Sequence, residues 1–492
     1  MLRDFDYENM PVADIVNEII IDAVKRGASD IHYDPRVENV IVRIRIDGEL
    51  VDYTMLPAGI KNHVVTKIKI LAGMNITESR LPQDGAIKTT IEDRSLDLRV
   101  STLPTVYGEK VVIRILDYAK SMEGLETLGF SEVSLEKLKR VIASPNGIIL
   151  VTGATGTGKS TTVYGILDKL NTKERNIITV EDPVEMKIEG INQVQAQSEI
   201  GLTFATALRS ILRQDPDTIM IGEIRDDETA RIAIRAAITG HLVLSTIHTN
   251  NSLNTIERLL DMDVERYLLG SALVGIVSQR LTKKLCPKCR TSRATTDYEK
   301  KIFKKAMGLD VDEIYAPVGC DECYKGYKGR IAIQEVLQVN QEIRDAILSN
   351  LRKDKLREII YKKGHTVSLL QDGLDKVLNG LTSIDEVLRV IEVDSDFGDD
   401  DQDIKDAIMG KDTPPSDEIL ETSTPVENTM TVSNNTEPTI QPNIATTVPI
   451  INTPTTQSVV EQPKTIESTI PQTPTEFAKE IPQQEVETLD LI

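Results

Sequence analysis

Between residues 131 and 284, short runs of apolar residues alternate with segments of helical periodicity. Four of the runs have the length of buried strands, and they lie at 148–151, 177–180, 218–221 and 242–247. Continuous apolar strands separated by helices are typical of a parallel sheet that is covered on both faces. The pattern therefore predicts an α/β core over 131–284.

The residues before this core follow a different pattern. Apolar positions at helical spacing predict a helix over 11–26, and an alternating segment at 40–46 followed by Asp47-Gly48 predicts a hairpin. Further strand signals lie at 86–91, 96–100 and 111–116. We expect a small α+β domain over 1–118, joined to the core by a linker over 119–130.

The chain after the core divides into three parts. Residues 285–335 form a short insert that contains the four cysteines, and 336–393 carry apolar residues at helical spacing, which predicts a helical region. From Asp394 onward the chain holds 20 acidic and four basic residues, many Thr and Pro residues and two aromatic side chains. Such a composition buries too little apolar surface to offset the entropy cost of ordering the backbone. We therefore expect a disordered acidic tail over 394–492.

Charge and hydropathy restrict the class of function. The formal net charge is −20, but most of it lies in the expected tail, so the rest of the chain is nearly balanced and has no basic block that would attract nucleic acid. The first residues lack the apolar segment of a secretory signal, and no run of about 18 apolar residues occurs. We expect a cytoplasmic chain that neither inserts into a membrane by itself nor binds nucleic acid.

A glycine-rich motif joins the first core strand to the helix that follows it. Its residues, with the one after it, are Gly153, Ala154, Thr155, Gly156, Thr157, Gly158, Lys159, Ser160 and Thr161. In a P-loop, the glycines let backbone N–H groups point at phosphate oxygens, and the helix N-terminus adds partial positive charge. Lys159 can reach the β- and γ-phosphates, and the Ser160 hydroxyl can bind Mg²⁺. We expect ATP and Mg²⁺ here; the alternative is an ordinary glycine-rich turn.

Four polar side chains follow the other core strands, at the edge where open α/β sheets bind ligands. Glu223 follows the third strand, and we expect it to orient or deprotonate the attacking water, unless it only forms a structural ion pair. Glu181 and Asp182 follow the second strand and are candidates for binding Mg²⁺ or water, or for an exposed turn. His248 follows the fourth strand, where a γ-phosphate sensor would lie, and structural hydrogen bonding is its alternative.

Several arginines could stabilise transition-state charge, which many P-loop ATPases achieve with an arginine of a neighbouring subunit. The candidates are Arg80, Arg99 and Arg114 in the N-terminal domain and Arg209 and Arg213 in the core. The alternative for each of them is an ordinary solvated arginine.

The four cysteines form two C-x-x-C pairs, Cys286 with Cys289 and Cys320 with Cys323, separated by 30 residues. Four thiolates supply the tetrahedral shell of a structural Zn²⁺, and such a site is closed because all of its ligands come from the protein. In a chain without an export signal, thiols held for a metal are favoured over disulfides. We therefore expect zinc, with reduced free thiols as the alternative.

Several segments together resemble the type II secretion and type IV pilus assembly ATPases, the GspE/PilB-like secretion ATPase superfamily. Residues 153–160, 181–185, 213–226 and 239–250 occur in the order of its Walker A, Asp, Walker B and His boxes. Residues 28–32 and 43–48 resemble its N-terminal PAS-like domain, and 279–281 and 326–330 also fit. The resemblance extends from about residue 10 to residue 392.

This resemblance implies a RecA-like P-loop ATPase fold preceded by a PAS-like domain, and a homo-hexamer that hydrolyses Mg-ATP. It also implies docking onto a polytopic inner-membrane platform protein, which would place the chain peripherally at the cytoplasmic membrane. The paired cysteines favour the pilus-extension and secretion branch over the retraction branch, which typically lacks them. The expected function is therefore assembly of a type IV pilus or a type II secretion pseudopilus. The alternatives are a retraction or DNA-uptake motor, a nucleic-acid translocase and a nucleotide-binding scaffold that does not hydrolyse.

Overall fold

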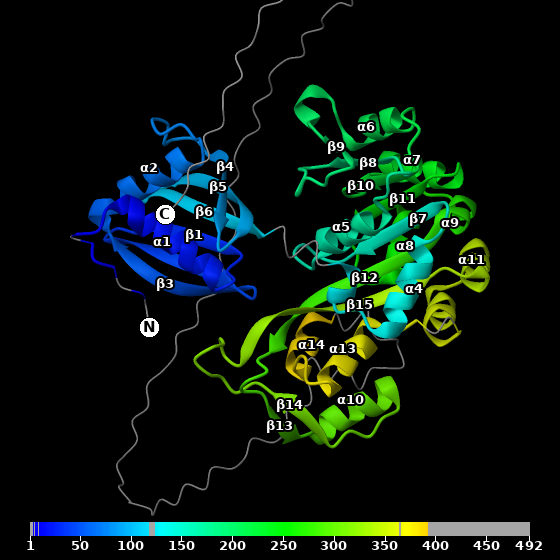
Figure 1. Cartoon of the computed structure of the whole chain (residues 1–492). Coiled ribbons are helices and arrows are strands. Elements are labelled where there is room, and N and C mark those ends of the chain that lie inside the picture. Colours follow the sequence, from blue (N-terminus) through cyan, green and yellow to red (C-terminus); the bar gives the residue numbers. More distant parts are fainter. Residues whose placement is uncertain (1–2, 4, 8, 118–123, 364–365, 392–492) are drawn as a thin grey trace, which may run out of the picture. The chain divides into compact units, whose positions relative to one another are not determined.

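The computed structural model describes residues 3, 5–7, 9–117, 124–363 and 366–391 (Figure 1). The expected linker at 119–130 lies partly outside these residues, and the expected acidic tail at 394–492 lies wholly outside them. An N-terminal sheet and a core sheet fall on either side of residue 118.

The N-terminal sheet contains six strands, and every neighbouring pair in it is antiparallel. The strands are β1 (Asp30–Pro35), β2 (Asn39–Ile46), β3 (Glu49–Pro57), β4 (Gln83–Ile91), β5 (Arg94–Thr105) and β6 (Gly108–Asp117), in the order β3-β2-β1-β6-β5-β4. Alternate residues of β2 are buried, because one face of the sheet packs against α1 (Val12–Lys25) and α2 (Lys61–Leu71). The expected helix at 11–26 and the hairpin through Asp47-Gly48 are confirmed. The PAS-like assignment stays a prediction.

The core sheet contains seven strands, of which the four expected ones form a parallel group. The strands are β7 (Gly147–Thr152), β8 (Ile177–Glu181), β9 (Asn192–Gln195), β10 (Thr218–Ile221), β11 (Leu242–Ile247), β12 (Leu273–Leu285) and β15 (Tyr327–Gln338), in the order β15-β12-β7-β11-β10-β8-β9. β12 runs parallel to β7 and antiparallel to β15. The sequence pattern did not predict β9, β12 or β15, and the expected boundary of the cysteine insert at 335 falls inside β15.

Different helices cover the two faces of the core sheet. The apolar residues Ile148 and Leu150 of β7 share one cluster with α6 (Phe204–Ile211), α7 (Asp227–Ile238), α8 (Ser252–Asp261), α9 (Arg266–Ala272) and α11 (Gln341–Leu348). The alternate residues Ile149 and Val151 share a second cluster with α4 (Glu132–Ile142) and α5 (Lys159–Leu170). Burial on both faces explains why residues 148–151 of β7 are all apolar.

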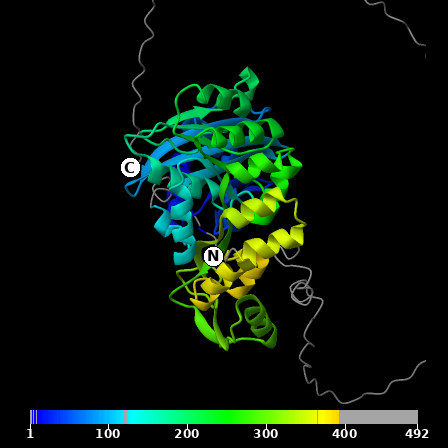
Figure 2. The ribbon, with the colours of Figure 1, turned by 90° about the vertical axis from the view of Figure 1, so that its right-hand side faces the viewer.

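The remaining elements lie together (Figure 1, Figure 2). α10 (Asp297–Met307), β14 (Glu313–Ala316), α13 (Leu369–Leu378) and α14 (Ile384–Val390) share an apolar cluster that also includes Ile333 of β15. β13 (Thr291–Ala294) pairs with β14. The short α12 (Lys353–Arg357) and a π-helical turn (Glu358–Lys363) pack against the core cluster instead. Of the helices that the structure describes, none is both long enough and apolar enough to cross a bilayer.

Candidate functional site

The glycine-rich loop lies where β7 ends, at Thr152, and α5 begins, at Lys159. At Gly153, a Cβ atom would lie 2.6 Å from the carbonyl oxygen of Gln279, and at Gly158 the backbone has a φ of 86°. A side chain would collide at the first position and strain the backbone at the second, so both require glycine. The loop thus leads from a buried strand directly to a helix N-terminus, which is the arrangement that binds phosphate.

The outer side of this loop is open to solvent. The exposed residues of the loop and of the first turn of α5 are Ala154, Thr155, Gly156 and Ser160, and Thr161 is half-buried. A ligand can therefore approach the loop backbone from outside. The expected binding of Mg²⁺ by the Ser160 hydroxyl stays a prediction.

The side chain of Lys159 is folded back over the loop. It is 9% exposed, and Nζ donates to the carbonyl oxygens of Gly153 at 2.9 Å and Ala154 at 3.1 Å. Burial lowers the pKa of Lys159, and the carboxylate of Glu223 opposes that shift. Carbonyl oxygens do not neutralise an ammonium, so its charge favours an anion at the loop.

Three of the predicted side chains meet at the carboxyl edge of the sheet. β8, β10 and β11 are neighbouring parallel strands, so Asp182, Glu223 and His248 leave the sheet on the same side. Nε2 of His248 lies 3.3 Å from Oε2 of Glu223. Oε1 of Glu223 pairs with Arg225, whose guanidinium is also 3.8 Å from Asp182. A carboxylate held between two cationic or polar donors at this edge is suited to orient a water molecule.

The sequence analysis did not single out Arg225 as a site residue. The signal that could have identified it is its position, two residues after Glu223 in the Walker B-like segment. The hydrogen bond to Glu223 raises the pKa of Arg225. Its side chain is 59% exposed, so the pair adds little to stability.

Glu181 lies in a buried hydrogen-bond network. Its Oε2 accepts a hydrogen bond from the Tyr164 hydroxyl at 2.5 Å, and its Oε1 accepts from Thr179 at 2.6 Å and from Gln193 at 3.1 Å. The Tyr164 hydroxyl in turn accepts the backbone N–H of Glu185 at 3.2 Å. Burial and the neighbouring carboxylate raise the pKa of Tyr164. In these contacts Glu181 connects α5 to the residues after β8, and its role toward Mg²⁺ or water stays a prediction.

Replacing Tyr164 with phenylalanine should lower the free energy of unfolding by about 1–3 kcal/mol, because the buried Glu181 carboxylate loses a donor. Chemical denaturation measures this change. Tyr267→Phe is the control, since Tyr267 is 61% exposed and should tolerate the change. Equal stability of the two variants would contradict the importance of this network.

Of the predicted arginines of the N-terminal domain, two lie on its sheet and one lies just before a strand. Arg99 on β5 and Arg114 on β6 are directly opposite in the ladder, and Arg114 lies 3.2 Å from Asp30. Arg80 precedes β4 and pairs with Glu78 at 2.7 Å. Their expected contact with nucleotide stays a prediction.

The predicted arginines of the core belong to α6 and the turn after it. Arg209 pairs with Glu228 at the start of α7, and Arg213 donates to the carbonyl oxygen of Arg209 at 2.7 Å. Both are exposed, as residues that reach a neighbouring subunit must be. Their catalytic role also stays a prediction.

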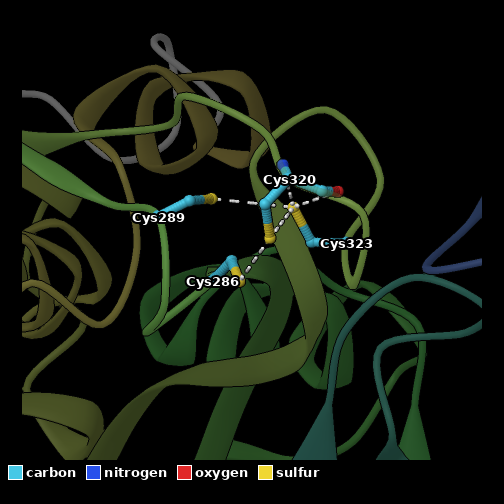
Figure 3. A group of neighbouring side chains, drawn as sticks. All are labelled: Cys286, Cys289, Cys320 and Cys323. Atoms are coloured by element: carbon cyan, nitrogen blue, oxygen red, sulfur yellow. Dashed lines mark hydrogen bonds between the residues drawn. The ribbon is translucent and has the colours of Figure 1, made fainter.

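The four cysteines turn their sulfur atoms toward one another (Figure 3). The Sγ atoms of Cys286 and Cys320 are 3.9 Å apart, those of Cys289 and Cys323 are 3.7 Å apart, and all four lie within 4.8 Å of one another. In a tetrahedral site with Zn–S bonds of about 2.3 Å, sulfur atoms are about 3.8 Å apart. The cluster therefore fits a structural Zn²⁺, as the spacing predicted.

Comparisons with known proteins agree with this geometry. A family model described as "Type II/IV secretion system protein" matches residues 6–389. The chain is 43% identical over 397 residues to the type II secretion system protein E of Aeromonas hydrophila, covering 80% of this chain and 78% of that protein. It is 47% identical over 380 residues to the type IV pilus assembly ATPase PilB of Thermus thermophilus, covering 77% and 43%. A solved structure of the pilus retraction motor PilT with bound ADP matches with a TM-score of 0.51 and 28% identity, covering 76% and 96%.

Proposed function

This chain belongs to the type II/IV secretion system protein family and is an ATPase, and we propose that it is a hexameric, Mg-dependent motor for assembly of a type IV pilus or a type II secretion pseudopilus. The observation that carries the proposal is the juxtaposition at one sheet edge of the phosphate-binding loop and the Glu223–His248 pair. A scaffold that only binds nucleotide would need the first feature but not the second.

Each residue at this edge has a defined task in the proposed reaction. The loop N–H groups and Lys159 bind the phosphates, and Ser160 holds Mg²⁺, which supplies positive charge to the phosphate oxygens when bound. Glu223 orients the attacking water or accepts its proton. The imidazole of His248, 3.3 Å from Glu223, fixes the direction of that carboxylate.

Assembly is favoured over retraction by two observations. The relatives that share 43–47% identity are named for type II secretion and pilus assembly, whereas the retraction motor shares 28%. The chain also holds the four-cysteine cluster, which the family resemblance associates with the pilus-extension and secretion branch. The partner on which the motor acts is a polytopic inner-membrane platform protein, which would hold the chain at the cytoplasmic face.

The proposed hexamer completes each catalytic site with arginines from a neighbouring subunit. The candidates from the core are Arg209 and Arg213, and those from the N-terminal domain are Arg80, Arg99 and Arg114. A shared site predicts that hydrolysis depends on association.

Phosphate release by the purified chain should therefore give a specific activity that rises with protein concentration and levels off when the ring is fully assembled. Sizing by light scattering over the same range should show the change from smaller species to hexamers. Lys159→Ala supplies the background rate. A constant specific activity from a chain that remains monomeric would contradict the shared-site proposal, while leaving the ATPase itself intact.

The direction of work is tested in the host cell. Replacing the native gene with the Lys159→Ala allele should abolish surface pili or secretion of pseudopilus-dependent substrates. An excess of surface pili would instead identify a retraction motor. Normal pili and secretion would contradict a motor role in either system.

A further inference from the structure

Strand β12 extends past the end of β7, beside the phosphate-binding loop. In the parallel ladder between them, Ser278 of β12 is the partner of Thr152, which is the last residue of β7. β12 continues to Leu285 with β15 as its neighbour on the other side. Gln279 is therefore the first residue of β12 that has no partner in β7, because the chain after Thr152 forms the loop.

The side chain of Gln279 connects the loop to the helix that follows it. It is 1% exposed, and its Nε2 donates to the carbonyl oxygen of Thr157 at 2.7 Å. Its Oε1 accepts a hydrogen bond from the hydroxyl of Thr162, on the first turn of α5, at 2.7 Å. The amide thus uses its donor on the loop and its acceptor on the helix.

A loop that binds anions needs partners for its carbonyl oxygens as well as free N–H groups. When the N–H groups face the ligand, the carbonyl groups face the protein, where each needs a donor. The carbonyl oxygens of Gly153 and Ala154 accept from Lys159, and that of Gly158 accepts from the backbone of Thr162. Gln279 supplies the donor for the carbonyl oxygen of Thr157.

We infer that Gln279 is a positioning residue for the phosphate-binding loop, acting through Thr157 and Thr162 without touching the nucleotide. Only a side chain with both a donor and an acceptor serves both partners. A glutamate at this position cannot donate to the Thr157 carbonyl, and it brings negative charge next to the phosphates. A methionine fills the space but makes neither bond.

Gln279→Glu and Gln279→Met should each weaken ADP binding and raise the KM for Mg-ATP by about tenfold or more, with a smaller effect on kcat. The loop holds the phosphates in the ground state and in the transition state alike, so its displacement is felt mainly in binding. Calorimetric titration with ADP and steady-state phosphate release measure the two effects.

Gln334→Met is the matched control. Gln334 lies opposite Gln279 in the β12–β15 ladder, is also fully buried, and donates to Leu128 at 3.4 Å, away from the loop. The Gln334→Met variant should lower the melting temperature, as the Gln279 variants should, but leave ADP affinity unchanged. Equal loss of ADP affinity in Gln334→Met, or unchanged affinity in both Gln279 variants, would overturn the inference.

Thr162→Val tests the same contact without altering Gln279. It should also weaken ADP binding. The double variant with Gln279→Met should lose less affinity than the sum of the two single losses, because both substitutions remove the same hydrogen bond between Thr162 and Gln279. Additive effects would contradict a shared contact, and this cycle still decides the question if Gln279→Glu does not fold.

The inference rests on the nucleotide site proposed above. A wild-type chain that binds no ADP refutes that site, whereas wild-type binding with unaffected variants refutes only the role of Gln279.

Discussion

Glu223→Gln should reduce the rate of ATP turnover by roughly 10²–10⁴-fold, the contribution typical of a general base, with ADP affinity close to that of the wild type. Glutamine keeps the shape of the side chain but cannot accept a proton or carry the negative charge that faces His248. The phosphate-binding loop is not altered, so binding is retained. Steady-state phosphate release and ADP titration on the same preparation measure both quantities.

Glu257→Gln is the control for removing a carboxylate at a distance from the loop. Glu257 lies on α8 and pairs with Lys353 at 2.7 Å. Its replacement should leave both turnover and ADP affinity unchanged. If Glu223→Gln turned over ATP at the wild-type rate, the carboxylate would be only the ion-pair partner of Arg225, and the assignment of water orientation to it would be wrong.

Cys286→Ser should remove the bound zinc and lower the stability of the chain by more than the Tyr164 or Gln279 substitutions do. Structural zinc contributes roughly 10–16 kcal/mol of binding free energy in small zinc-binding peptides, and that energy is folding energy for the segment that it closes. The chain should contain one zinc per subunit by elemental analysis, and the variant should contain much less. Thermal unfolding should show a lower melting temperature for the variant and for chelator-treated wild type.

Glu322→Gln is the matched control because Glu322 lies between Cys320 and Cys323 and pairs with Lys288, at the rim of the cluster. Its replacement removes an exposed ion pair but no thiolate, so zinc content and melting temperature should stay near wild type. A wild-type chain that contains no zinc and is unaffected by chelators would leave the cluster as four reduced thiols.

The core strands that the sequence predicted are those that are buried at every residue. β7, β8, β10 and β11 are covered on both faces, so each contains a short, mostly apolar run. β12 and β15 were not predicted because they carry buried polar residues whose hydrogen-bond partners lie on distant segments of the chain. Glu335 is an example: it is 1% exposed and accepts the backbone N–H of Ser252 and the hydroxyl of Tyr361. The periodicity of apolar residues along the chain does not predict such partners.

The residues of the candidate site also fall into a group that the sequence predicted and a group that it did not. Lys159, Glu223 and His248 were predicted from motif spacing and strand ends, and the cysteine cluster was predicted from the metal-ligand spacing of its pairs. The supporting contacts were not, since Gln279 and Thr162 are 117 positions apart in sequence. Tertiary packing decides which distant side chains form a hydrogen bond. Such a pairing cannot be predicted from the spacing of residues along one sequence.

The thirteen residues of β12 also make a mechanical connection. Gln279 borders the phosphate-binding loop, and Cys286 follows directly after the last residue of the same strand. At about 3.3 Å per residue, Gln279 and Cys286 are roughly 23 Å apart along the strand. An extended strand that is hydrogen-bonded to β15 over most of its length behaves as a strut. One hydrogen-bonded strand therefore joins the phosphate-binding loop directly to the cysteine cluster.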